Sequence, residues 1–82
     1  MPNKKRRYTV EEQQFFKNIG FKVQFFRKKC DMSQFQLAEK ADLSQATIGH
    51  LESTNVHVIS LVSLYRIAKA LGVSPDQLLK FD

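Results

Sequence analysis

The residues with the clearest capacity for recognition chemistry lie between positions 44 and 52. If this stretch is a helix, Ile48 and Leu51 point to the core, because residues three apart share a face. The opposite face then carries four small or hydrogen-bonding residues: Gln45, Ala46, Gly49 and His50. A glutamine amide can bond two atoms of an adenine edge, an imidazole can donate to guanine, and a methyl group can contact thymine. Thr47, at the edge of this face, suits a phosphate or a sugar. The pattern predicts a helix face that reads base pairs.

Patterns typical of catalysis or of metal binding are absent from the sequence. It contains no nucleophile paired with a base, no glycine-rich phosphate loop, no paired carboxylates and no cluster of metal ligands. His50 and His57 lack further ligands, and we expect His57 to be plain surface. Cys30 is the only cysteine, so no intrachain disulfide can form, and we expect a buried thiol at a helix end. We therefore expect no enzyme, no metal and no cofactor.

Positive charge is concentrated at the start of the chain. The formal net charge is +5, and four of the thirteen cations are Lys4, Lys5, Arg6 and Arg7. The rest of the chain carries nine cations against eight acids and is nearly neutral. We expect residues 1–8 to form a flexible basic arm that contacts the DNA backbone, and residues 9–82 to form one domain. No apolar run is long enough for a signal peptide or a membrane span, which favours a cytoplasmic protein.

Helix start and stop signals divide the domain into five predicted helices. Thr9 with Glu12 predicts a helix over 10–29, and Ser33 with Gln36 predicts a helix of about two turns that ends at Asp42. Serines also precede the predicted helices over 45–52 and 61–71, and Ser74 with Pro75 begins a fifth that ends near residue 81. The fold class is therefore all-α, with a helix-turn-helix at the second and third helices.

Two local features qualify this pattern. Gly20 lies in the middle of the first predicted helix, which indicates that a neighbouring helix approaches closely there. Only Val56 to Ile59 alternates enough for a short strand.

Many residues in the right order resemble one known family. They are Ile19-Gly20, Arg27, Ser33 to Ala38, Leu43 to Ile48, Leu51-Glu52 and Leu64 to Val73. From Ile19 to Leu79, about three-quarters of the chain, the sequence resembles the lambdoid-repressor and Cro type of helix-turn-helix domain, the xenobiotic-response-element family. The resemblance implies a five-helix lambda-repressor-like fold and a sequence-specific regulator of transcription, most simply a repressor, that binds double-stranded DNA.

The resemblance also implies roles for particular residues. The helix over 45–52 would be the recognition helix, Gln34 would hold a backbone phosphate, and Arg27 would pair with Glu52 to link the first and third helices. Related domains form homodimers through the fifth helix and nearby loops. Here that interface would contain Val56, Val58, Leu78, Leu79 and Phe81.

Backbone phosphates are the expected targets of a wider set of residues. Besides the arm, these are Ser33, Gln34, Ser44, Thr47, Ser53, Thr54 and Asn55. The chain departs from the family pattern here, because Ser53-Thr54 stands where arginine or asparagine followed by glycine is usual. The loop to Ser60 is also one residue longer than is usual.

Three phenylalanines, Phe21, Phe25 and Phe35, occupy positions that are commonly polar in the family. They indicate an extra packing surface, covered either by the segment from Tyr8 to Phe16 or by a protein partner. The alternative function is therefore an antitoxin or another protein-binding module that also regulates its own operon.

Overall fold

Only helices and loops occur in the part of the chain that the computed structural model describes, residues 7–53 and 56–81. The elements are α1 (Val10–Lys29), α2 (Gln34–Ala41), α3 (Gln45–Glu52), α4 (Leu61–Leu71) and the 3-10 helix η1 (Pro75–Leu78). The all-helical prediction is confirmed. The possible strand over Val56 to Ile59 is wrong, because no second extended segment lies within the described ranges to pair with it.

The fifth helix is a correction to the sequence prediction. Four α-helices are present in the described residues, and Pro75–Leu78 forms a single 3-10 turn. The backbone N–H of Gln77 donates to the Ser74 carbonyl and that of Leu79 to the Asp76 carbonyl, each at 3.0 Å, which is the tighter spacing of a 3-10 helix. The turn ends at Leu78, and the described residues after it, 79–81, are not helical.

The predicted helix starts are confirmed in detail. Thr9 and Glu12 form a reciprocal capping box on α1, and Ser33 and Gln36 form one on α2. The hydroxyl oxygens of Ser44 and Ser60 each accept a hydrogen bond from the backbone N–H three residues later. Because capping depends on residues close in sequence, these boundaries follow directly from local chemistry.

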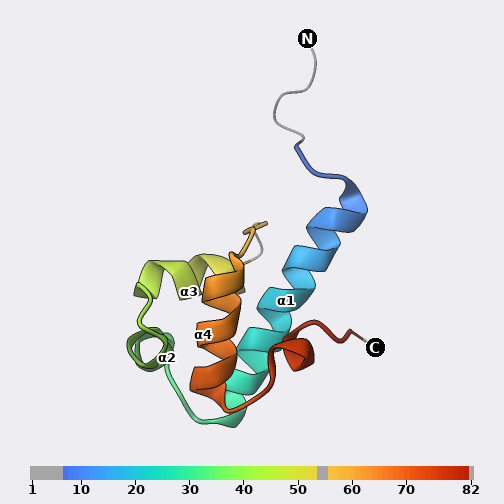
Figure 1. Ribbon diagram of the computed structural model, residues 1–82. Coiled ribbons are helices and arrows are strands. Elements are labelled where there is room, and N and C mark those ends of the chain that lie inside the picture. The colour runs from blue at the N-terminus through green and yellow to red at the C-terminus, as the bar shows by residue number, and fades with distance from the viewer. Residues whose placement is uncertain (1–6, 54–55, 82) are drawn as a thin grey trace.

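The core forms where α2, α3 and α4 meet α1. Figure 1 shows α3 lying across the top of α4, α2 viewed almost end-on below α3, and α1 running diagonally behind them. The fully buried large side chains come from every element: Ile19, Val23, Leu37, Ile48, Leu51, Ile67 and Leu78. One compact core thus fixes the position of α3 from several sides.

α3 approaches α1 closely at Gly20. A methyl group at Gly20 would overlap the backbone carbonyl of Leu51, in the last turn of α3. This confirms the predicted approach of a neighbouring helix. The glycine therefore sets the distance between the longest helix and the helix expected to read DNA.

The first turns of α1 extend beyond the helical body, on the side of the loop that follows α3 (Figure 1). Aromatic contacts hold this extension: Tyr8 packs edge-on against Phe16, and Phe15 packs against Phe81 near the C-terminus. No helix among the described residues is long and apolar enough to cross a membrane.

Cys30 corrects another expectation, because it is exposed and not buried. It is the residue that caps α1, with φ −89° and ψ 4°, so the chain already leaves the helix there. The apolar stripe of α1 therefore ends before this position.

Candidate DNA-binding surface

A tight turn joins α2 to α3 and sets their relative direction. Asp42 ends α2 in the left-handed conformation at φ 58°, and the backbone N–H of Leu43 bonds the Ala38 carbonyl at 2.9 Å. Leu43 is half-buried against the core. Ser44 then caps the N-terminus of α3, so the turn between the two helices contains only residues 42–44.

The outer face of α3 carries most of the predicted base-reading residues. Gln45, Ala46 and His50 are exposed, Gly49 is half-buried, and Ile48 and Leu51 are buried beneath them. The face is uncharged and ends in a histidine. Its amide, methyl group, bare backbone and imidazole have the sizes and hydrogen-bonding groups that suit the major groove.

Thr47 is more constrained than the sequence suggests. Its backbone N–H donates to the Ser44 hydroxyl at 3.0 Å, and the two hydroxyl oxygens lie 2.8 Å apart. Ser44 and Thr47 therefore form one capping unit at the N-terminus of α3. Ser33 caps α2 in the same way, accepting from Gln36 at 3.0 Å.

Arg27 on α1 and Glu52 on α3 form a nearly buried ion pair. The guanidinium donates from Nε to Oε2 at 2.7 Å and from Nη2 to Oε1 at 2.8 Å. Its Nη1 donates to the Met32 carbonyl at 2.7 Å. The side chains are only 9% and 1% exposed. The hydrogen bonds to Glu52 raise the pKa of Arg27 above its usual value, although burial opposes this.

Gln34 joins the same group through its side-chain amide. Its Nε2 donates to Oε1 of Glu52 at 3.1 Å, so one carboxylate receives both the arginine and the glutamine. The amide oxygen of Gln34 also faces Gly49, where a methyl group would lie 3.6 Å away. We call Arg27, Glu52 and Gln34 the clamp. It ties the first turn of α2 and the last turn of α3 to α1.

The structure places His57 next to this surface, which the sequence did not predict. Its ring lies beside the ring of His50, with 6.3 Å between centroids and a 40° tilt. The loop returns toward α3, and Ser53 caps the end of that helix by donating from its hydroxyl to the His50 carbonyl at 2.8 Å. No signal in the sequence relates a histidine at the end of a helix to one in the loop seven residues later.

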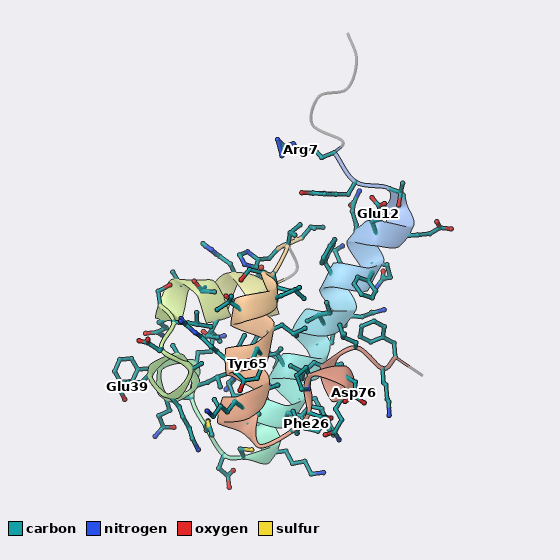
Figure 2. All side chains as sticks on the ribbon, in the orientation of Figure 1. Arg7, Glu12, Phe26, Glu39, Tyr65 and Asp76 are labelled. Carbon is teal, nitrogen blue, oxygen red and sulfur yellow. The ribbon has the colours of Figure 1, made fainter. Side chains whose placement is uncertain are left out.

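The described end of the predicted arm, Arg7 and Tyr8, lies beside this loop. Arg7 is exposed, and together with Tyr8, Gln13, Val56 and Val58 it lines a hollow of about 260 Å³. Figure 2 shows the Arg7 side chain above the start of α1, pointing toward the side where α3 ends. Lys4, Lys5, Arg6, Thr54 and Asn55, all predicted to contact DNA, lie outside the described residues.

The residues predicted for the dimer interface differ in accessibility. Val58 and Leu79 are exposed, and Val56 and Phe81 are half-buried. Leu78 is a correction: it is fully buried in the core, because η1 turns this side chain toward α4 and α1. Three exposed apolar residues on α4 were not predicted, namely Leu61, Val62 and Tyr65.

Phe21, Phe25 and Phe35 are all more than half exposed, the first two on α1 and the third in the first turn of α2. Among the described residues, no group of three or more histidine, cysteine, aspartate or glutamate side chains could hold a metal ion.

Comparisons with known proteins agree with this geometry. A helix-turn-helix family model matches residues 23–78. Control protein C.BamHI of Bacillus amyloliquefaciens is 43% identical over 64 residues, which span 77% of this chain and 78% of that protein.

Two solved structures share the fold. The restriction-modification controller protein C.AhdI from Aeromonas hydrophila superposes with a TM-score of 0.72 at 27% identity, covering 77% of this chain and 94% of that one. The hypothetical transcription factor NHTF from Neisseria superposes with a TM-score of 0.75 at 29% identity, covering 83% and 75%.

Proposed function

Because this chain belongs to the helix-turn-helix family and is a DNA-binding regulator of transcription, we propose that it represses genes as a homodimer by placing α3 in the major groove. The observation that carries this proposal is the outer face of α3, where Gln45, Ala46 and His50 are exposed above a buried Ile48 and Leu51. We place the protein in the cytoplasm because its partner is DNA.

Each residue of that face has a proposed role. Gln45 pairs with an adenine edge, His50 donates to a guanine, and Ala46 contacts a thymine methyl group. Gly49 lets the helix backbone approach the bases. The half-buried Thr47 and the capping Ser44 lie where the free N–H groups of the first turn of α3 face a phosphate.

A second set of residues positions the protein on the DNA backbone. Ser33 and Gln34 do so at the start of α2, and Ser53, Thr54 and Asn55 after α3. The hydrogen bond from Gln34 to Glu52 supports this role, because it orients the amide and leaves its second N–H available for a phosphate.

The basic arm, residues 1–8 with Lys4, Lys5, Arg6 and Arg7, adds contacts to the backbone. Arg7 supports this assignment, since it lines a hollow with Val56 and Val58, in the loop that follows the recognition helix. Lysine and arginine side chains that neutralise phosphates raise affinity for any DNA sequence.

The homodimer interface proposed here contains Val56, Val58, Leu79 and Phe81, and the buried Leu78 is left out. Leu61, Val62 and Tyr65 of α4 are also exposed and follow Val58 closely in the sequence. We propose that they add apolar area to this interface. A two-fold dimer would place the two α3 helices on half-sites roughly 34 Å apart in a palindromic operator.

The names of the relatives support a specific regulatory setting. C.AhdI is a restriction-modification controller and C.BamHI is a control protein. We therefore propose that this chain controls the genes of a restriction-modification system. The second candidate is an antitoxin that binds a toxin and represses its own operon, which the exposed phenylalanines favour.

The decisive experiment selects binding sites from random duplexes with the wild-type chain and then measures affinity for the selected site. We expect Gln45→Ala and His50→Ala each to lower the affinity roughly tenfold or more, with unchanged melting temperatures, because each base contact contributes directly to binding. Gln14→Ala, an exposed glutamine on α1, is the matched control and should bind normally. Unchanged affinity and sequence preference in the double variant Gln45→Ala, His50→Ala would refute the proposal.

A further inference from the structure

An aromatic ridge lies on the outer side of α1. Phe21 and Phe25 are 53% and 55% exposed, although each lies next to a buried or half-buried residue of the same helix. They are four residues apart, so their rings lie on one face one turn from each other. Lys17 and Lys28 share this face, at four residues before Phe21 and three after Phe25. We call these four residues the α1 ridge.

Along the part of α1 that carries the ridge, the charged side chains have one sign. From Gln13 to Lys29 the helix contains lysines and an arginine but no acidic residue, and Arg27 is already paired. The ammonium group of Lys29 lies 5.7 Å from the centre of the Phe25 ring, and that of Lys22 lies 5.5 Å from the Phe26 ring. One of the two exposed rings, that of Phe25, therefore has an ammonium group beside it.

The part of the chain that the structure describes leaves Phe21 and Phe25 more than half exposed. α3, α4 and η1 all pack against α1, and α3 does so at Gly20 and Arg27. At about 100° per residue, Phe21 lies about 100° around the helix from Gly20, and Phe25 about 140°. Phe21 and Phe25 therefore lie on a different side of α1 from the one that packs against α3, so the α1 ridge and the outer face of α3 are separate surfaces.

We propose that the α1 ridge docks an acidic amphipathic segment of a partner protein. Apolar side chains of that segment would cover Phe21 and Phe25, and its carboxylates would pair with Lys17, Lys28 and Lys29. Charge complementarity selects this occupant, because a second copy of the chain would bring two sets of lysines together. The inference deepens the protein-partner role described above and leaves Phe35 out of that surface, since Phe35 lies on α2 and not on α1.

The test uses a library of random 16-residue peptides displayed on phage, with the folded wild-type chain as the target. We expect the selected peptides to carry net negative charge and at least two apolar anchors. Their affinity should fall roughly tenfold or more for the double variant Phe21→Gln, Phe25→Gln, because apolar anchors dominate binding at such sites. It should also fall in Lys17→Glu, Lys28→Glu. Phe35→Gln is the matched control, because Phe35 is also 55% exposed, and it should change the affinity less than twofold.

Several outcomes would overturn the inference. The library yields no binding peptide, or the selected peptides carry no excess of acidic residues. Alternatively, the affinity of the selected peptides is the same for the wild type and for the double variant Phe21→Gln, Phe25→Gln. Binding of the ridge to random duplexes or to phosphatidylglycerol vesicles, lost in that variant, would assign the face to nucleic acid or membrane instead. Operator binding separates this inference from the proposed function, since the ridge variants should retain it at the wild-type melting temperature.

Discussion

At the residue scale, Arg27 connects α1 to α3 and to the segment before α2. Its guanidinium makes two hydrogen bonds to Glu52 and one to the Met32 carbonyl, in a site that is 8% exposed. A buried ion pair gains little over an apolar pair of the same shape, but removing one partner leaves an uncompensated charge. The pair therefore fixes the orientation of α3 more than it adds stability.

Arg27→Ala should lower both the stability of the fold and its affinity for DNA. We expect a loss of about 3 to 5 kcal/mol in the free energy of unfolding, because Glu52 would remain buried without a partner. Urea denaturation measures this loss. The double variant Arg27→Ala, Glu52→Ala should lose less than the sum of the two single changes. A wild-type melting curve for Arg27→Ala would contradict the role given to the pair.

The two glycines of the α1 and α3 helices provide a second test at the same scale. Gly20→Ala should destabilise the fold by about 1 to 3 kcal/mol, because its methyl group overlaps the Leu51 carbonyl and pushes α3 away. Gly49→Ala meets only the Gln34 amide oxygen at 3.6 Å and should keep or raise stability by up to about 1 kcal/mol. Gly49→Ala should nevertheless weaken DNA binding if the backbone approaches the bases there. Thermal melting and operator binding of both variants separate packing from recognition.

Secondary-structure elements were predictable where their signals are local. The caps at Thr9, Ser33, Ser44 and Ser60 are all present, since each depends on a partner three residues away. The segment after Ser74 was not, because capping residues can begin an α-helix or a 3-10 turn equally well. In a 3-10 turn Leu78 points to the core and Leu79 to solvent, and the sequence alone cannot assign these neighbours to opposite sides.

The η1 turn also makes a prediction about acid stability. A hydrogen bond from Ser74, and to a smaller degree Lys80, holds the pKa of Asp76 below its usual value. A carboxyl group with a lowered pKa stabilises the folded state above the unfolded pKa of 3.8, and this contribution disappears as the pH falls through the folded value. Asp76→Asn should therefore melt below the wild type at pH 7, and the difference should vanish in strong acid. A difference that persists in strong acid would exclude this cause.

At the scale of the whole molecule, three features concern surfaces that no short pattern describes. The sequence predicted the outer face of α3, because helical periodicity determines it. It did not predict that His57 lies beside His50, that Cys30 is exposed, or that Leu61, Val62 and Tyr65 are exposed apolar residues on α4. These features depend on how a loop and a helix end pack in three dimensions, so they required the structure.

The basic arm is testable at this scale through the salt dependence of DNA binding. Deleting residues 1–7 should reduce the slope of log affinity against log salt by about 3 to 4 if all four cations contact phosphates. The melting temperature should change little, because the capping box at Thr9 and Glu12 remains. The affinity of the deleted and complete chains is measured between low and moderate salt. Equal slopes would leave the arm without a role in binding.

The clamp has a consequence for transplanting specificity between relatives. The carboxylate of Glu52 accepts hydrogen bonds from both Arg27 of α1 and Gln34 of α2. α3 therefore cannot be exchanged without regard to these contacts. A chimera that receives a recognition helix from a relative should remain folded and keep its orientation on DNA only if the donor helix also ends in glutamate. New operators are then reached by exchanging positions 45, 46, 49 and 50 while this three-way junction stays intact.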